Sequence, residues 1–97
     1  MALTKEQFDN IKDKSFEIAF NPEEVSKCEL IEVKGINSFT LKEGQSEPFS
    51  IVFETKSDLV YDQNTFMVKN ADLDEFPLFL VPIGADEKGV RYEAIFT

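Results

Sequence analysis

Apolar and polar residues alternate along most of this chain with a period of two, which is the spacing of a β-strand that buries one face. The alternation is clearest where phenylalanine and isoleucine take every second position, at 16–20 and at 49–53. Groups of Asn, Asp, Gly and Pro separate these segments from further apolar stretches. The pattern predicts about six strands, within residues 15–20, 25–36, 49–54, 65–69, 76–83 and 90–96.

The first residues follow a different pattern, that of a short helix. Thr4 has the side chain and position of an N-cap, and Gln7, three residues later, completes a capping box. Phe8 and Ile11 then share one face of the helix. We therefore expect a helix within residues 1–13 that packs on part of the sheet.

The second predicted strand changes parity part-way along. Cys28 and Leu30 fall on one face of an ideal strand, whereas Ile31 and Val33 fall on the other. A β-bulge at this point would explain the change, and so would a strand that is covered on both faces. Residues 35–48 after it are predicted to be mostly loop.

The last two strands are predicted to form a hairpin, because Gly84 and Gly89 enclose a short polar connection between them. Both glycines are expected to adopt a positive φ. Pro77 and Pro82 each remove a backbone donor, on opposite edges of the strand, which confines pairing on both sides to residues 78–81. Both faces are apolar there, so we expect the N-terminal helix to cover the outer one.

These elements predict an all-β fold, mainly antiparallel, built as a small barrel or sandwich of about six strands with one short N-terminal helix packed on it. A chain of 97 residues has the size of one compact domain. We therefore assign a single domain to residues 1–97, with the helix in 1–13 and the β-structure in 14–97. Ten phenylalanines and no tryptophan indicate a core built around phenylalanine rings.

The charge of the chain bears on its partners. The net charge is −9 and the acidic residues are spread along the whole length, which is typical of a solvated surface, with a docking face for a basic partner as the alternative. No cluster of Lys and Arg is present, so neither nucleic acid nor an anionic membrane is an expected partner. The sequence shows no apolar segment as long as a membrane span and no signal peptide. A single cysteine, Cys28, fits a reducing compartment, so we expect a cytoplasmic location.

Side chains suited to catalysis are scarce. The chain has no histidine, which removes the commonest general base and metal ligand. Cys28 lies among apolar neighbours in a predicted strand, where we expect a buried and unreactive thiol. The acidic segment 72–75 suggests a calcium site, but it offers three carboxylates and no glycine. We therefore predict no catalytic, cofactor-binding or metal-binding residues, no cofactor, and no enzymatic activity.

Four blocks of the sequence resemble a small family of bacterial domains that has no assigned function. The blocks are 49–53, 63–66, 79–84 and 92–96, and the last two, of the types FLVPIG and YEAIF, are the most specific. The resemblance extends over nearly the full length of the chain. It implies a bacterial or phage-derived protein, and because some relatives are encoded near phage-tail-collar-like proteins, it also implies a place in a phage-tail-like assembly. It supplies no catalytic residue that could be carried over to this chain.

Two functions are compatible with this sequence. The first, which we favour, is a non-enzymatic protein-interaction or assembly module that binds a protein partner through its sheet. The alternative is a small-molecule-binding β-barrel with a mouth lined by phenylalanine and by Tyr61 or Tyr92. Arg91 is the only arginine, and it alone can make a planar bidentate contact. The candidate interaction residues are therefore Arg91, Tyr61 and Tyr92.

Overall fold

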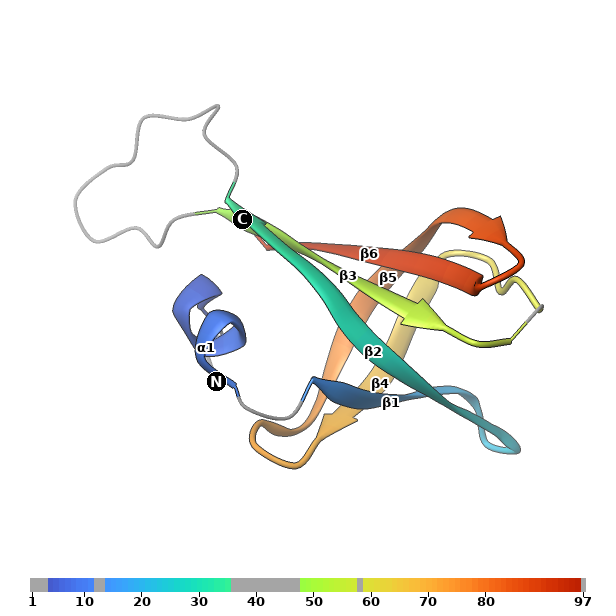
Figure 1. Ribbon diagram of the computed structural model, residues 1–97. Helices are drawn as coiled ribbons and strands as arrows, with labels where there is room; N and C mark the ends of the chain where they lie inside the picture. Colours follow the sequence, from blue (N-terminus) through green and yellow to red (C-terminus); the bar gives the residue numbers. More distant parts are fainter. Residues whose placement is uncertain (1–3, 12–13, 36–47, 58, 97) are drawn as a thin grey trace.

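The computed structural model describes residues 4–11, 14–35, 48–57 and 59–96, and these form a closed six-stranded β-barrel with one helix at its end (Figure 1). Among the described residues, no helix has the length and apolar character needed to cross a membrane. The elements in chain order are α1 (Lys5–Asn10), β1 (Ser15–Asn21), β2 (Glu24–Gly35), β3 (Phe49–Thr55), β4 (Asn64–Asn70), β5 (Asp74–Asp86) and β6 (Gly89–Phe96).

The strand pairs that the structure describes are all antiparallel. Around the barrel the strands follow the order β1-β2-β3-β6-β5-β4, and β4 pairs with β1 to close the ring. These findings confirm the all-β, antiparallel fold with a short N-terminal helix. They also decide between the two predicted architectures in favour of the barrel, because a sandwich would leave edge strands without a partner.

The interior of the barrel is filled largely by aromatic side chains. Phe16 and Phe53 lie near its middle with their ring centroids 4.8 Å apart, and both are at most 1% exposed. Towards the β5–β6 turn, Phe20 stacks on Tyr61 and packs against Tyr92. The alternation of the strands places these residues inside, since every second residue points to the same face. The prediction of a core built around phenylalanine is confirmed.

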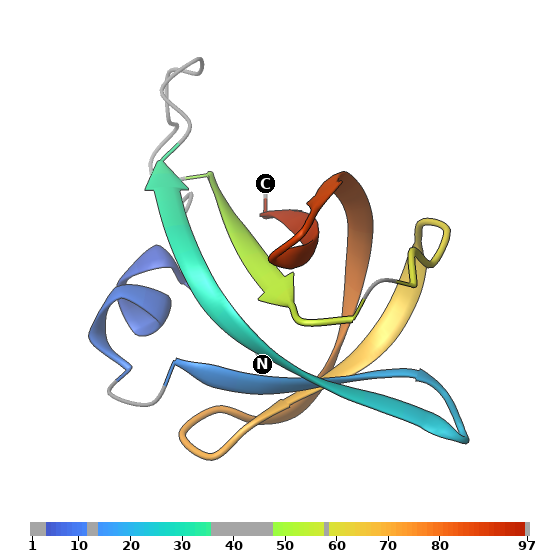
Figure 2. The same ribbon diagram turned by 45° about the vertical axis from the view of Figure 1, so that its right-hand side comes forward.

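The helix α1 begins with the predicted capping box. The hydroxyl of Thr4 accepts a hydrogen bond from the Gln7 amide at 3.3 Å, and the Thr4 amide donates to Oε1 of Gln7 at 2.8 Å. Phe8 is fully buried, with its ring centroid 5.8 Å from that of Phe49 and 5.5 Å from that of Phe96. The helix therefore closes the end of the barrel at which β3 begins and β6 ends (Figures 1 and 2).

The prediction that this helix covers the outer face of β5 is wrong. Phe79 on that face is 52% exposed, whereas Phe8 reaches Phe76, which packs against the interior of the barrel. The physical reason is that the barrel end presents aromatic rings from β3, β5 and β6 together. One phenylalanine buries more apolar area there than it would on a single strand.

The strand β5 changes its partner half-way along. Residues 74–80 pair with β4, and residues 81–86 pair with β6. The two prolines left pairing on both sides possible only at 78–81, and the described pairs give each of these residues one partner strand. Pro77 lies in the half that pairs with β4 and Pro82 in the half that pairs with β6. A missing amide costs little in a half-strand that has one open edge.

The strand β2 contains the predicted β-bulge. Its pairing with β3 shifts by one residue between Leu30 and Glu32, which leaves Ile31 outside the ladder. Leu30 is buried, whereas Ile31 is 45% exposed, so the alternative of a strand covered on both faces does not apply. The loop predicted after this strand lies outside the described residues over 36–47.

The two glycines of the last hairpin have different roles. Gly89 adopts a φ of 136°, as predicted, and a Cβ at this position would lie 1.6 Å from the carbonyl oxygen of Thr55. Gly84 does not adopt a positive φ, so the prediction for it is wrong. Its Cβ would lie 3.1 Å from Nη2 of Arg91, which shows that the missing side chain leaves room for the guanidinium group across the strand pair.

Candidate interaction surface

The register of the barrel places outward-facing residues of four consecutive strands side by side. Ala19 of β1 is opposite Val25 of β2 and opposite Met67 of β4, and Met67 is opposite Pro77 of β5. We call these four residues the apolar row. Directly opposite residues of antiparallel strands have their Cβ atoms about 4.5–5.5 Å apart, so the row is continuous across the four strands.

The apolar row is open to solvent. Val25 is 55% exposed and Met67 is 40% exposed. Phe79 follows Pro77 by two residues on the same face of β5, is 52% exposed, and extends the row at one corner. Single apolar residues are normal on a protein surface, but a contiguous group of them marks a candidate binding surface.

A row of charged residues runs beside the apolar row, two residues away from it on each strand. Glu17 of β1 is opposite Lys27 of β2 and opposite Lys69 of β4, and Lys69 is opposite Glu75 of β5. These four residues, the charged row, are all exposed, and their charges alternate in sign. The ion pairs that the structure describes lie in α1 and around Arg91, which leaves the charged row available to a partner.

The opposite wall of the barrel mixes the two kinds of residue. Val52 of β3 lies between Glu32 of β2 and Glu93 of β6, and Glu93 is opposite Val81 of β5. We call these four residues the mixed row. Val52 points outward but is only 3% exposed. Long charged side chains on both neighbouring strands cover apolar surface with their methylene groups while their charged ends stay in water.

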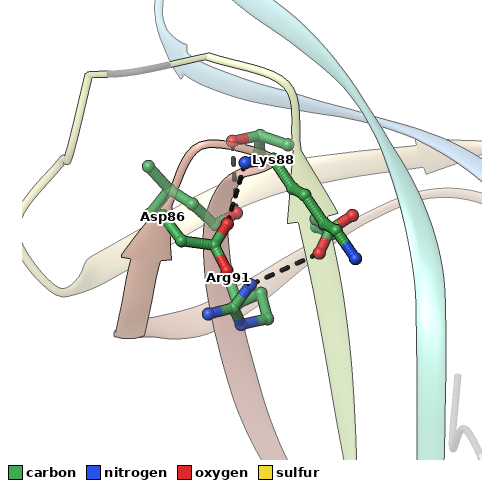
Figure 3. Close-up of polar contacts among 6 residues, drawn as sticks. Asp86, Lys88 and Arg91 are labelled. Atoms are coloured by element: carbon green, nitrogen blue, oxygen red, sulfur yellow. Dashed lines mark hydrogen bonds and ion pairs between the residues drawn. The ribbon is translucent and has the colours of Figure 1, made fainter.

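Arg91, a candidate from the sequence, is engaged within the barrel wall (Figure 3). Its Nη1 donates to Oδ2 of Asp86 at 3.1 Å and to Oε2 of Glu54 at 3.4 Å. The pKa of the Asp86 carboxyl is lowered, first by the hydrogen bond from the Lys88 amide and then by Arg91. The pKa of Arg91 is raised, first by Asp86 and then by Glu54. Arg91 thus ties the β5–β6 turn to β3, and its charge is already paired.

The other two candidates, Tyr61 and Tyr92, belong to one end of the core. Tyr92 is fully buried, and its hydroxyl accepts a hydrogen bond from the Tyr61 amide at 3.0 Å. The ring of Tyr61 stacks on Phe20 with 4.2 Å between centroids. Burial raises the pKa of both tyrosines, and the charge of Glu24 raises that of Tyr61 further. The structure does not join Arg91 to this pair in one site, because Arg91 and Tyr92 point to opposite faces of β6.

A cavity of about 370 Å³ lies where the start of β1 and the end of β4 separate. Its wall includes Cys28, and Glu17, Lys27 and Lys69 place it beside the charged row. Burial, followed by the charge of Glu17, raises the pKa of the Cys28 thiol to about 12. The thiol donates to the carbonyl of Phe16 and remains protonated at neutral pH, so it is a poor nucleophile. The predicted burial of this cysteine is confirmed.

The acidic segment 72–75 spans the end of the turn between β4 and β5 and the first two residues of β5. Asn70 organises this turn, since its Oδ1 accepts from the Asp72 amide at 2.7 Å and its Nδ2 donates to the Ser15 carbonyl at 2.9 Å. Within the described ranges, no group of three or more His, Cys, Asp or Glu side chains is arranged to hold a metal ion. The turn therefore serves to connect the β4–β5 hairpin to β1.

A protein-family model, described as a domain of unknown function (DUF6916), matches residues 3–96. The chain belongs to this family. No curated protein and no solved structure matches it. The DUF6916 match confirms the resemblance to a small family without an assigned function, and it spans the helix and all the strands described above.

The apolar row of this DUF6916 domain is the feature that the sequence did not reveal. Met67 and Phe79 could be recognised as outward-facing, because each lies at the opposite parity to buried residues of its strand. Nothing in the sequence related them to Ala19 or Val25, since β1 and β4 are not consecutive strands. The relation exists only in the closed barrel.

Proposed function

We propose that this DUF6916 domain is a non-enzymatic protein-interaction or assembly module that binds a protein partner through the apolar row and Phe79. The observation that carries the proposal is the register, which places outward-facing apolar residues of four neighbouring strands in one continuous row, most of them exposed. Water is released from this surface when a partner covers it, and the release supplies a driving force of about 25 cal/mol per Å². A surface of this kind with a polar border is typical of a docking site.

The charged row supports a protein as the partner. It presents two cations and two anions in alternation, which another protein surface can match charge by charge. Nucleic acid would require cations concentrated on one face, and alternating signs do not provide such a face. An anionic membrane makes the same demand, so neither is proposed as a partner.

We place this module in the cytoplasm or in a phage-tail-like assembly. The lone cysteine supports the first location, and the resemblance of blocks 79–84 and 92–96 supports the second. In both settings the domain would contribute by binding, not by catalysis. The protonated thiol of Cys28 and the paired charge of Arg91 support this part of the proposal.

A small-molecule-binding barrel is the second candidate function, and the cavity beside Cys28 is the observation that favours it. A volume of about 370 Å³ lies in the range of small ligand sites. Because Lys27 and Lys69 are part of the wall, the ligand would be a small anionic molecule. NMR shift changes confined to Ser15, Cys28 and their neighbours on addition of small carboxylates or phosphates would support this function. Shifts that are absent or scattered over the barrel would contradict it.

The interaction proposal is tested by comparing which proteins the wild type and its variants retain from an extract of the cells that encode it. The test variant combines Met67→Glu with Phe79→Glu and introduces two charges into the proposed surface. The matched control combines Ile31→Glu with Ile83→Glu, which are 45% and 50% exposed and lie outside the apolar row. We expect the wild type and the control to retain the same proteins, and the test variant to lose them.

Thermal unfolding followed by circular dichroism establishes first that both double variants are folded. The two variants change the net charge equally, so a non-specific charge effect would appear in both. A test variant that retains the same proteins as the wild type would contradict the proposed surface. A wild type that retains no protein in repeated experiments would contradict the interaction function itself.

A further inference from the structure

We propose that the apolar and charged rows bind a second copy of this chain. The two copies would be related by a two-fold axis that lies in the plane of contact, parallel to the strands, between β1 and β4. This inference rests on the proposed function, because it names the partner of the same surface. Such an axis brings β1 opposite β4 of the second copy and β4 opposite β1 of the second copy. β2 and β5 lie on opposite sides of the closed ring, so they border the contact and do not face each other across it.

The rotation brings the two central charges of the charged row opposite charges of the other sign. Within one chain, Glu17 of β1 is opposite Lys69 of β4. Across the contact, Glu17 faces Lys69 of the second copy, and Lys69 faces Glu17 of the second copy. The described ion pairs leave both side chains available for these two contacts. Lys27 and Glu75 lie on opposite sides of the closed ring and stay outside the contact.

The same rotation superimposes the apolar row on itself, because an axis parallel to the strands keeps each residue at its level along them. Met67 then faces Ala19 of the second copy, and Ala19 faces Met67 of the second copy. A long flexible methionine over a small alanine allows the two surfaces to interlock. Charge and shape thus favour the same arrangement.

The mixed row of the opposite wall does not have this property. Its two central residues are Val52 of β3 and Glu93 of β6. A two-fold axis between these strands would place Val52 opposite Glu93 of the second copy, and Glu93 opposite Val52. Carboxylates would lose water without gaining a counter-charge, which is unfavourable. Self-association is therefore expected through the apolar and charged rows and not through the mixed row.

The association is expected to be weak and reversible. Each copy carries a net charge of −9, so the copies repel each other at long range. The wall of a small barrel is also convex, which centres the contact on β1 and β4 (Figure 2). We expect a dissociation constant on the order of 10–100 μM at physiological salt, as for other small interfaces.

Sedimentation equilibrium of charge-reversal variants of the full chain tests the arrangement. Glu17→Lys brings two lysines together across the contact, and Lys69→Glu brings two glutamates together. Each variant alone should associate at least about tenfold more weakly than the wild type. An equimolar mixture of the two variants should regain association, because the lysine introduced at position 17 then faces the glutamate introduced at position 69. Pairing within one chain cannot produce this result, since mixing leaves each chain unchanged.

Glu32→Lys and Lys34→Glu are the matched controls. They make the same charge changes at exposed residues of β2 outside the apolar and charged rows, and they should leave association within about twofold of the wild type. Thermal unfolding of every variant checks that the barrel is intact.

Three results would overturn the proposal: a wild type that is monomeric up to about 1 mM, a dimer that the single reversals do not weaken, or a mixture that associates no better than either variant. The measurement uses purified chain only, so it is independent of the extract experiment. If the wild type is monomeric but Met67→Glu with Phe79→Glu still loses retained proteins, self-association fails while the interaction function stands.

Discussion

The β1–β4 wall of the barrel and the β3–β6 wall expose the same kinds of side chain in different orders. On the β1–β4 wall, apolar and charged residues occupy separate rows, and Met67 is 40% exposed. On the β3–β6 wall they share one row, and Val52 between two glutamates is 3% exposed. The charges differ in the same way, because Arg91 is paired within the β3–β6 wall, whereas the ion pairs among the described residues do not include the charged row.

This contrast shows that the order of residues across the strands, more than their composition, distinguishes a binding surface from an ordinary solvated wall. A glutamate beside a valine can cover it with methylene groups, and an arginine between two carboxylates neutralises them locally. On the β3–β6 wall, Val52 and Arg91 are satisfied by their own neighbours, whereas Ile95 of β6 is 60% exposed. The β1–β4 wall leaves exposed apolar side chains in one row and exposed charges of alternating sign in the next.

The largest effect is expected where the β3–β6 wall is most tightly packed. Gly89→Ala places a Cβ 1.6 Å from the Thr55 carbonyl oxygen at a φ of 136°, which a side chain cannot accept without moving the backbone. We expect a loss of roughly 3 kcal/mol or more in the free energy of unfolding, measured by urea denaturation. Gly84→Ala is the control and should cost less than about 1 kcal/mol, because only the flexible end of Arg91 must move. Equal losses in the two variants would contradict this account.

An intermediate effect is expected when threonine replaces one outward-facing apolar residue on each wall. Val52→Thr buries a hydroxyl group in a site that is 3% exposed and should lower the free energy of unfolding by about 1–3 kcal/mol. Met67→Thr changes a residue that is 40% exposed and should cost less than about 1 kcal/mol, since threonine suits a strand and stays hydrated there. Urea denaturation of both variants measures the difference. The contrast between the walls would be lost if Met67→Thr were the more destabilising change.

The smallest effect is expected at Arg91. Because the pKa of Asp86 is lowered in the folded protein, its carboxylate stabilises the fold above its ordinary pKa of 3.8, and this contribution is lost as the pH falls through the lowered value. In Arg91→Ala the pKa of Asp86, measured by NMR titration, should rise but stay below 3.8, because the Lys88 amide is the larger cause. Stability at neutral pH should fall less than in Val52→Thr, and the proteins retained from the extract should not change. Loss of those proteins would show that the β3–β6 wall also binds a partner.

The fold was largely predictable because its signals are local. The alternation of Phe49, Ile51 and Phe53 placed β3 correctly, and Thr4 with Gln7 marked the start of α1. The change of parity after Leu30 indicated the bulge in β2. Each of these signals depends on residues a few positions apart, whose relation is set by backbone geometry alone.

The candidate site was not predictable in the same way. Arg91, Tyr61 and Tyr92 were selected for the chemistry of their side chains, but the structure pairs Arg91 with carboxylates and buries Tyr92 completely. Residue type indicates what a side chain can do and not whether a neighbour already uses it. The prediction of where α1 packs was wrong for a related reason. The rings that Phe8 covers come together only when the barrel closes.

The amino-acid sequence by itself determined which residues of each strand face inward, where the chain turns, and that phenylalanine rings fill the interior. Only the tertiary structure decided which outward residues become neighbours, and with them the apolar and charged rows. The physical reason is that alternation follows from each residue's own backbone, whereas the register of β1 against β4 depends on every turn, bulge and strand around the closed ring. A shift of one residue in that register would turn one strand's side chains to the other face and remove both rows.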